Sequence, residues 1–223
     1  MRFGKINYLN LAPFDVFIKK YPLPSTFKLF LNHHKSYPSK LNKEFLFRRI
    51  DAGFISSIAG MNAKKTKSAI ISYGEVWSVI AIKRESKLDY QSASSNALSR
   101  ILKIDGEILI GDRALRYKLK NNDYIDLGEE WWKKHHLPFA FGLLCYNKHR
   151  DLYLKLSTSF NQKNIKIPQY LLENYEKDSQ IKKQDIKKYL TKIHYKVSNK
   201  PKIALMRFYR SIRLNRIKIP TRF

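Results

Sequence analysis

Cysteine is almost absent from this chain, which has one, Cys145, among its 223 residues. A single thiol forms no internal disulfide, and it excludes both a disulfide-rich secreted scaffold and a zinc cluster built from cysteines. Cys145 stands in an apolar stretch without a neighbouring base, so we interpret it as a buried structural thiol and not as a nucleophile. A reducing compartment is the expected setting.

Long hydrophobic runs are also missing. The longest uninterrupted apolar stretch, residues 139–146, is far shorter than the ~20 residues that a membrane-spanning helix needs. Residues 1–10 contain no apolar signal-peptide core. We therefore expect a cytoplasmic protein without a membrane partner.

The familiar catalytic and metal-binding motifs are absent as well. The sequence contains no Walker loop, no GxGxxG and no GxSxG. Its six histidines are His33, His34, His135, His136, His149 and His194. Neither adjacent pair has the spacing that places two ligands on one helix face, so no metal site is predicted. Glu129 and Glu130 fall in a predicted first helical turn, where acids complement the helix dipole, and this reading is preferred to an acid/base pair.

Positive charge is abundant. Lys and Arg number 44 against 18 Asp and Glu, a net charge of +26. Residues 1–147 hold 24 basic and 13 acidic residues, whereas residues 148–223 hold 20 and 5. Such a field attracts anions, so nucleic acid and a small dicarboxylate are both candidate partners. Alternatively, the positive net charge reflects a generally basic proteome and no particular partner.

Short apolar runs alternate with amphipathic stretches, a pattern typical of a mostly parallel sheet covered by helices, and α/β is the predicted fold class. Strands are predicted at residues 3–9, 52–55, 69–73, 76–83, 107–110 and 139–146. Helices between them are predicted at residues 39–50, 95–104, 112–120 and 128–136.

After residue 147 the pattern is helical only, which predicts a C-terminal helical appendage without strands. The helices are expected at residues 149–161, 168–177, 179–192 and 201–214. No repeat or flexible linker separates two domains, so a second lobe must be an internal segment. The runs at residues 76–83 and 139–147 are the best places for the chain to leave a first lobe and return to it.

Small polar residues stand where predicted strands end and helices begin, the edge at which open α/β sheets bind ligands. They are Ser56, Ser57, Ser94, Ser95, Gly111 and Asp112. Hydroxyls and free backbone N–H groups at helix N-termini suit a carboxylate, so this set favours a small organic anion. The alternative is that Ser94, Ser95 and Asp112 are ordinary helix caps.

Several motifs in order resemble the chorismate dehydratase family of the futalosine route to menaquinone. They are Asn7-Tyr8-Leu9-Asn10 with Pro13, Gly74-Glu75-Val76-Trp77-Ser78-Val79, Ser92-Ala93-Ser94-Ser95, Leu109-Ile110-Gly111-Asp112-Arg113-Ala114-Leu115, and Asp126-Leu127-Gly128-Glu129-Glu130-Trp131 before Leu137-Pro138-Phe139. The segment from Tyr189-Leu190 to Ile193-His194-Tyr195 is also similar.

The resemblance implies a two-lobed fold like the type II periplasmic binding proteins, with a ligand cleft between the lobes. Lobe one would comprise residues 1–82 and 148–223, and lobe two residues 83–147. The implied reaction, that of a hydro-lyase, removes water from chorismate to give 3-[(1-carboxyvinyl)oxy]benzoate, with no metal or organic cofactor. A substrate carboxylate would accept the proton, so the enzyme would mainly orient the dianion and stabilise charge in the transition state.

The resemblance also implies roles for single residues. Asn10 matches the family's active-site asparagine, and Ser78 matches a serine at the mouth between the lobes. Ser56, Ser57, Ser94 and Ser95 would hold carboxylates, and Asp112 would close the cleft from lobe two or bond a ring hydroxyl. Gly111 is also expected to bind the substrate. This chain departs from the family in two places, with His135-His136 where Thr-Gly is common and Ser94 where threonine is common.

Three other functions stay open. A sister family, which makes 1,4-dihydroxy-6-naphthoate, shares the fold but opens with a Ser-Pro-Cys-Pro-Asn-Asp motif that this chain lacks. A non-catalytic anion receptor would bind chorismate and leave it unchanged. Nucleic-acid binding is the third, and specific nucleic-acid function is not expected because no such motif accompanies the basic C-terminal helix. The basic residues of that helix are Arg207, Arg210, Arg213 and Arg216, beside the apolar Leu205, Phe208, Tyr209 and Ile212.

Overall fold

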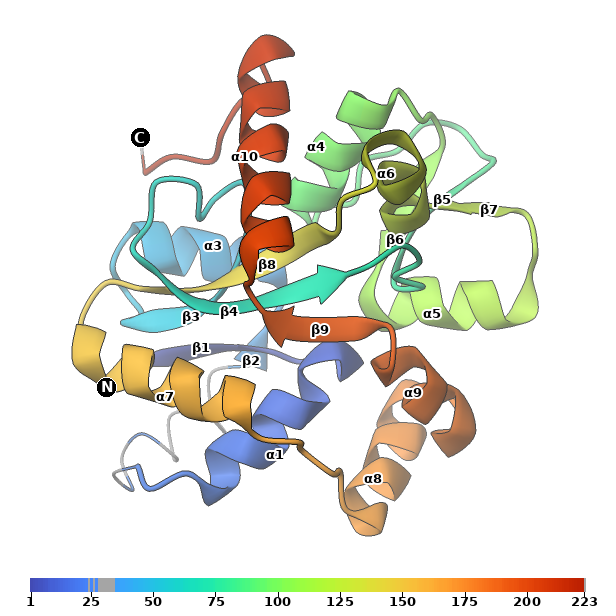
Figure 1. The fold of residues 1–223 in the computed structure, drawn as a ribbon. Coiled ribbons are helices and arrows are strands. Elements are labelled where there is room, and N and C mark those ends of the chain that lie inside the picture. Colours follow the sequence, from blue (N-terminus) through green and yellow to red (C-terminus); the bar gives the residue numbers. More distant parts are fainter. Residues whose placement is uncertain (24, 26, 28–34, 223) are drawn as a thin grey trace.

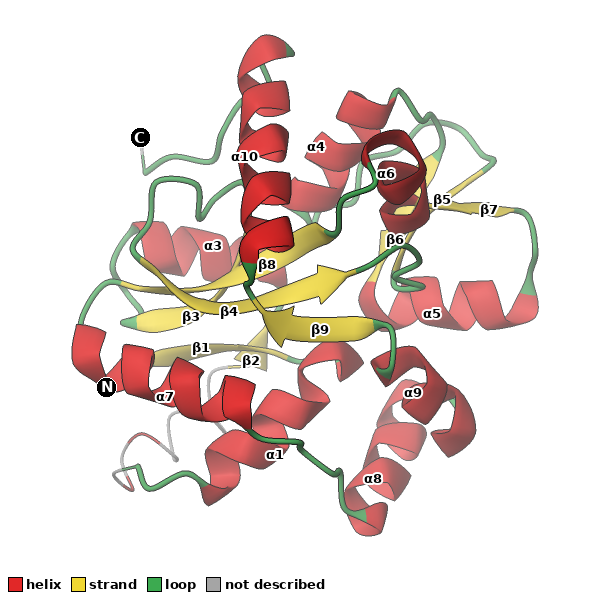
Figure 2. Cartoon of the chain, viewed as in Figure 1, coloured by secondary structure: helices red, strands yellow, loops and turns green. Residues whose placement is uncertain are grey.

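The computed structural model describes residues 1–23, 25, 27 and 35–222, which form two β-sheets and the helices packed on them (Figures 1 and 2). The larger sheet has the strand order β2 (Lys35–Ser36), β1 (Phe3–Ile6), β3 (Ala52–Ser56), β8 (Phe139–Tyr146), β4 (Lys65–Ser72) and β9 (Ile193–Lys196). The smaller sheet has the order β6 (Glu107–Ile110), β5 (Val79–Ile82) and β7 (Tyr124–Asp126).

Helices cover both faces of the larger sheet, as Figure 1 shows. On one face lie α1 (Ala12–Lys20) and α7 (Arg150–Gln162), and on the other lie α3 (Pro38–Leu46) and α10 (Asn199–Leu214). The smaller sheet is accompanied by α4 (Ala93–Leu102), α5 (Gly111–Lys120) and α6 (Leu127–His135). The 3₁₀ turn η1 (Leu9–Leu11) precedes α1, and α8 (Gln169–Ser179) and α9 (Lys183–Leu190) precede β9.

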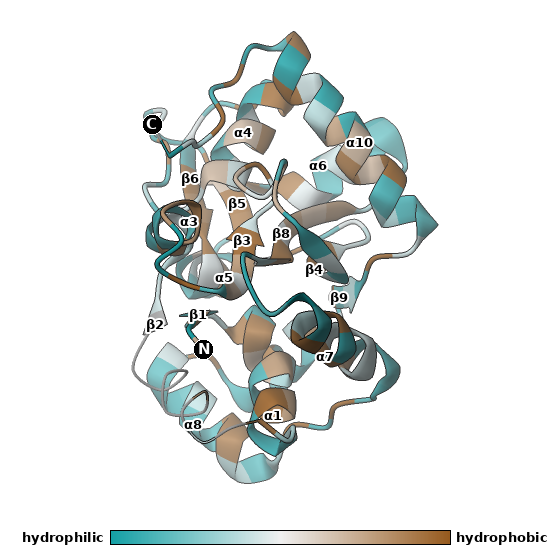
Figure 3. Ribbon diagram, turned by 90° about the vertical axis from the view of Figure 1, so that its left-hand side faces the viewer, coloured by the Kyte–Doolittle hydropathy of each residue, from teal (hydrophilic) through white to brown (hydrophobic). Residues whose placement is uncertain are grey.

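Aromatic rings fix the helices to the larger sheet. Phe14 of α1 meets Phe54 of β3 edge-on, with ring centroids 5.0 Å apart, and meets Phe160 of α7 at 5.1 Å. On the other face, Phe139 of β8 meets Phe208 of α10 edge-on at 4.9 Å. Such pairs add to the burial of large apolar area. Figure 3 shows the apolar residues on the strands between the helices and hydrophilic residues on outward parts of α7 and α10.

The prediction of a mostly parallel sheet is wrong. Only β1 runs parallel to its neighbours, β2 and β3; the other pairs of both sheets are antiparallel. The strands are apolar on both faces because helices cover both faces, and that pattern reports burial and not strand direction. The direction follows from β8, which returns from the smaller sheet and runs opposite to β3 and β4.

The expectation of a purely helical C-terminal region is also wrong, because β9 pairs antiparallel with β4. The predicted helix over residues 179–192 is the shorter α9, and the strand follows it directly. A four-residue edge strand carries too little pattern to be separated from the lysine-rich helices around it. α1 was not predicted, although Pro13 near its start is a usual helix-initiating residue.

The chain leaves the larger sheet after β4 and returns to it at β8, with all three strands of the smaller sheet in between. β5 pairs with β6 and β7 and so belongs to the smaller sheet. The predicted boundary at residue 82 instead groups residues 79–82 with lobe one. The lobe boundaries stay a prediction. Among the described residues, no helix combines the length and the apolarity needed to cross a bilayer.

Candidate active site

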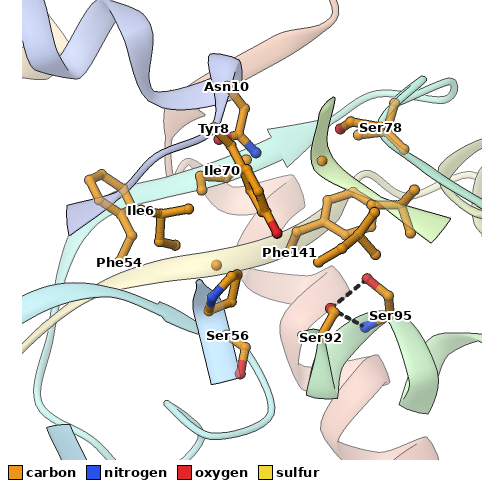
Figure 4. A pocket seen from close by; sticks show the side chains of 16 residues that line it. Ile6, Tyr8, Asn10, Phe54, Ser56, Ile70, Ser78, Ser92, Ser95 and Phe141 are labelled. Atoms are coloured by element: carbon orange, nitrogen blue, oxygen red, sulfur yellow. Dashed lines mark hydrogen bonds between the residues drawn. The ribbon is translucent and has the colours of Figure 1, made fainter. Parts of the chain in front are cut away.

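A pocket lies between elements of the two sheets and contains about 510 Å³ of space between protein atoms, part of it open to solvent. The space that the centre of a water molecule can reach is about 50 Å³, which is small for a ligand site, so the walls of the pocket lie close together. Side chains from distant parts of the chain converge on it, as Figure 4 shows. The lining residues are Ile6, Tyr8, Asn10, Pro38, Phe54, Ser56, Ile70, Val76, Ser78, Val79, Ser92, Ser95, Ile110, Gly111, Phe141 and Gly142.

The lining is mostly apolar, with a few polar groups and no charged side chain. None of these residues is Asp, Glu, Lys, Arg or His. Its polar groups are hydroxyls, one carboxamide and backbone, set among apolar side chains. An anion bound here would be held by neutral hydrogen-bond donors in surroundings of low dielectric, where each such bond is strong.

Asn10 lies in η1 at one side of the pocket (Figure 4). Its Oδ1 atom is buried and has no hydrogen-bond partner. Leaving a buried acceptor unsatisfied costs about 1–3 kcal/mol. Other buried polar atoms also lack a partner, but Asn10 lines this pocket, where a bound ligand can supply the donor. Its backbone oxygen accepts a hydrogen bond from the Tyr195 hydroxyl at 2.6 Å.

Ser78 lies across the pocket from the larger sheet, directly before β5, and its side chain is buried. The Tyr189 hydroxyl donates to Ser78 Oγ at 2.8 Å, and the backbone N–H of Gly111 donates to the Ser78 carbonyl at 2.8 Å. Ser78 is therefore fixed at both its side chain and its backbone.

The turn before Ser78 is held by Asp126. Trp77 has a φ of 64°, which is unusual for a residue other than glycine. The Asp126 carboxylate accepts from Trp77 N at 2.7 Å and from Val76 N at 3.1 Å, and it also caps α6. Burial raises the pKa of Asp126 to about 6, while the backbone N–H groups that donate to it favour its charged form. These bonds stabilise a strained turn beside the site.

The predicted serines separate into two groups. Ser95 lines the pocket, and with it Ser92, which sequence reasoning missed. Ser92, and not Ser94 or Ser95, is the N-cap of α4: it accepts from Ser95 N at 3.2 Å and donates to Ser95 Oγ at 2.7 Å. Ser57 and Ser94 lie outside the lining.

Ser57 and Ser94 are hydrogen-bonded to each other, with their Oγ atoms 3.1 Å apart. The Ser57 hydroxyl also donates to the Ala140 carbonyl at 2.6 Å, and Ser94 accepts from Ile58 N at 3.1 Å. They join the loop after β3 to α4 and β8. Ser56 does line the pocket, and its Oγ accepts from Asn42 Nδ2 at 2.6 Å.

Gly111 lines the pocket where a side chain would not fit. Its φ is 61°, and an added Cβ would lie 2.8 Å from the Tyr8 ring. The Tyr8 hydroxyl donates to Gln91 Oε1 at 2.5 Å. Gly111 therefore permits the Tyr8 ring to pack closely against the start of α5.

Asp112 lies outside the lining, and it is not the N-cap of α5, which is Ile110. Its Oδ1 accepts from Leu9 N at 3.3 Å, which ties η1 to α5. Burial raises the pKa of Asp112 to about 6. The structure thus brings Asn10, Ser56, Ser78, Ser95 and Gly111 into one pocket.

The residues that sequence reasoning missed are Tyr8, Ser92, Tyr189 and Tyr195. All four stand in motifs that carry the family resemblance, which was the available signal. Neither spacing nor periodicity identifies the bond from Tyr189 to Ser78, because the two residues are 111 positions apart.

The other candidate groups are placed as follows. Burial raises the pKa of the Cys145 thiol to about 12, so it is an unreactive core residue, as predicted. No cluster of three or more His, Cys, Asp or Glu suited to a metal occurs among the described residues. His33 and His34 lie outside those residues.

Comparisons with known proteins agree with the motifs. Residues 89–213 match the family described as menaquinone biosynthesis. The chain is 43% identical over 216 residues to a chorismate dehydratase of Campylobacter jejuni, covering 95% of this chain and 97% of the relative.

Solved structures show the same fold at low sequence identity. A protein of Archaeoglobus fulgidus has a TM-score of 0.66 at 12% identity, covering 97% of this chain and 98% of its own. An ABC transporter protein of Parabacteroides distasonis has a TM-score of 0.59 at 14% identity, covering 99% and 96%. The predicted α/β fold is confirmed: the chain has two sheets with helices packed on them and shares its fold with both proteins. By its identity to the Campylobacter protein over nearly its whole length, the chain belongs to the chorismate dehydratase family of menaquinone biosynthesis.

Proposed function

We propose that this protein is a hydro-lyase that converts chorismate into 3-[(1-carboxyvinyl)oxy]benzoate, as a step of the futalosine route to menaquinone. The observation that carries the proposal is the uncharged pocket to which Asn10, with a buried and unpartnered Oδ1, contributes polar groups together with Ser78 and Ser95. The family to which the chain belongs supports the same reaction.

The chemistry asks little of the protein beyond orientation. The ring carbon that bears the ether oxygen loses a proton, and the neighbouring carbon loses its hydroxyl; the C–H electrons form the new ring double bond. One water leaves, and the ring becomes aromatic, which makes the overall reaction favourable. A carboxylate of the substrate takes the proton and passes it to the departing hydroxide, which gives the water and restores the carboxylate. A protein base is then unnecessary, and the pocket lining contains no Asp, Glu or His.

The residues then take simple roles. Asn10 can accept from the departing hydroxyl through Oδ1 and donate to its oxygen or to a carboxylate through Nδ2. Ser78 donates to the substrate from the opposite side. The Ser95 hydroxyl and the N-terminus of α4 hold a carboxylate, while Ser92, whose own proton goes to Ser95 Oγ, orients the Ser95 hydroxyl. These interactions orient the substrate and stabilise charge as it develops.

The test is to incubate purified protein with chorismate and to separate the products by chromatography with mass detection. The proposal predicts loss of chorismate, a product lighter by one water, and the ultraviolet absorption of a benzoate. A protein that binds chorismate and returns it unchanged would be an anion receptor, which contradicts the proposal. Protein boiled before mixing serves as the control for spontaneous decay.

A further inference from the structure

Two tyrosines from one short segment each contact a residue to which we assign chemistry. Tyr189 is the penultimate residue of α9 and is 1% exposed, and its hydroxyl donates to Ser78 Oγ at 2.8 Å. Tyr195 lies in β9, and its hydroxyl donates to the Asn10 backbone oxygen at 2.6 Å. The C-terminal part of the chain thus reaches both Ser78 and Asn10, neither of which is near it in sequence.

The hydrogen bond from Tyr189 to Ser78 leaves the Ser78 hydroxyl proton available for donation to another group. A hydroxyl has one proton and two acceptor sites. Because Tyr189 is the donor in this pair, the Ser78 proton is not used in it, and no described residue accepts that proton. Ser78 lines the pocket, so its proton is available to a bound substrate.

Tyr195 acts on the turn that carries Asn10. η1 is only three residues long, and no side chain caps its start. The Asn10 carbonyl accepts from Tyr195, which anchors this short turn to β9. The backbone of Asn10 is therefore fixed even though the side-chain Oδ1 stays unpartnered.

The segment that carries the two tyrosines is itself held in place. β9 pairs with β4 through Ile71 with His194 and Ser72 with Ile193. The Tyr195 ring meets Phe160 of α7 edge-on, at 5.1 Å between centroids. A hydroxyl on such a support keeps a fixed direction, which is what preorganisation of a site requires.

We propose that Tyr189 and Tyr195 are positioning residues of this site: Tyr189 directs the Ser78 hydroxyl toward the substrate, and Tyr195 fixes Asn10 through its backbone. This inference rests on the proposed function. Tyr189 does not line the pocket and acts through Ser78, so removing its hydroxyl should lower kcat more than it changes KM.

The experiment is a double-mutant cycle with Tyr189→Phe, Ser78→Ala and the double variant. We expect kcat to fall about 10-fold for Tyr189→Phe and about 100-fold for Ser78→Ala, with KM within about 2-fold for Tyr189→Phe. The double variant should match Ser78→Ala, because the tyrosine has nothing left to direct. Effects that multiply to about 1000-fold would show that Tyr189 acts on structure alone, and would overturn its role.

A second double-mutant cycle, with Tyr195 and Asn10, tests the role proposed for Tyr195. It also keeps the proposal testable if Tyr189→Phe does not fold. Tyr195→Phe should lower kcat about 10-fold alone and add little to Asn10→Ala. Wild-type-like kcat in both tyrosine variants, or multiplicative effects in both cycles, would overturn the inference while the function stands. An inactive wild-type protein would overturn the function and this inference with it.

Tyr153→Phe is the matched control. Tyr153 is fully buried like Tyr189, but its hydroxyl has no hydrogen-bond partner and the residue is not part of the pocket lining. Removing this hydroxyl should leave kcat and KM unchanged. A fall in kcat equal to that of Tyr189→Phe would show that loss of any buried hydroxyl slows the enzyme, which contradicts the proposal.

Discussion

Asn10 contributes a buried hydrogen-bond acceptor without a donor, which is uncommon in protein interiors. Its side-chain oxygen is buried without a donor, while its backbone oxygen is bonded. A polar group left in this state costs stability, and substrate can supply the missing partner. The same feature therefore connects a small destabilisation of the free protein with recognition of a ligand.

The Asn10→Ala variant tests this connection. Turnover of chorismate should fall on the order of 100-fold, because the variant removes a group that acts on the transition state. The fold should be preserved, since an unpartnered polar group is replaced by a methyl. Steady-state kinetics and a thermal melt measure the two effects. A folded variant with near-normal turnover would remove Asn10 from the mechanism.

Asp112 makes a prediction about pH. Its pKa of about 6 in the folded protein exceeds the ordinary aspartate pKa of 3.8, so between these pH values the folded state binds more protons than the unfolded state. The free energy of unfolding should therefore decrease as pH rises through this window, by at most about 3 kcal/mol. Asp112→Asn, which keeps an oxygen to accept from Leu9 N, should lose this contribution and be more stable at pH 7.

Urea unfolding of both proteins at pH 4.5, 5.5 and 7 measures the difference between them, and other titrating groups cancel in the comparison. Parallel pH profiles for the two proteins would contradict the raised pKa of Asp112.

Single residues of the site were predicted unevenly. Asn10 and Ser78 came from the family resemblance, which also implied their chemistry. Ser57 and Ser94 were chosen because they follow a strand or start a helix, but their hydroxyls bond to each other and to backbone. Position along the chain places a serine near an edge of the sheet; only the packed structure decides whether its hydroxyl has a partner already.

Among the helices, α4 links stability most directly to the pocket. Its N-cap, Ser92, bonds to both the backbone N–H and the hydroxyl of Ser95, and both serines line the pocket. The sequence predicted this helix from residue 95, and the structure begins it at Ala93. The difference matters because it identifies Ser92 as the cap.

Replacing that cap has a defined cost. Ser92→Ala should lower stability by about 1 kcal/mol, which corresponds to a melting temperature about 2–4 °C lower for a protein of this size. Ser92→Thr keeps the hydroxyl and should lose much less. Differential scanning calorimetry of the three proteins provides the comparison. Equal melting temperatures for the wild type and Ser92→Ala would mean that the cap is not stabilising.

At the level of helices and strands, apolar periodicity predicted most elements but not how they pair. β6 and β8 were predicted with their observed bounds, and the observed α5 begins at Gly111, one residue before the predicted start. Direction and neighbour were not available from periodicity, because β3 and β4 are consecutive in sequence and yet both pair with β8. The edge strand β9 was missed because four residues beside lysine-rich helices give too weak a signal.

At the scale of the whole molecule, the large positive charge lies on residues that do not line the pocket. The net charge is +26, and residues 186–223 contain twelve Lys and Arg with no Asp or Glu, whereas the pocket lining carries none of these four. The charge therefore acts on an anionic substrate at long range, before contact. Binding inside the pocket depends on neutral donors, which salt screens weakly.

This separation predicts how salt affects the enzyme. kcat/KM for chorismate should fall as NaCl is raised from about 10 mM to 500 mM, because screening weakens capture of the dianion. kcat should change little, since the bound substrate faces no charged side chain of the lining. Sucrose at matched osmolality controls for water activity. Flat kcat/KM across the series would rule out steering by the net charge.

The position of β8 has a consequence for synthesis on the ribosome. β3 and β4 are not neighbours; β8 lies between them, and it ends at Tyr146. All strands of the smaller sheet are synthesised before β8, so the smaller sheet can form first. β3 and β4 stay unpaired with each other until β8 is synthesised and pairs with both. A nascent chain that ends near residue 130 would thus present one unpaired edge of β3 and both edges of β4 to chaperones, because β8 and β9 are still to come. The substrate pocket would be completed only late in translation.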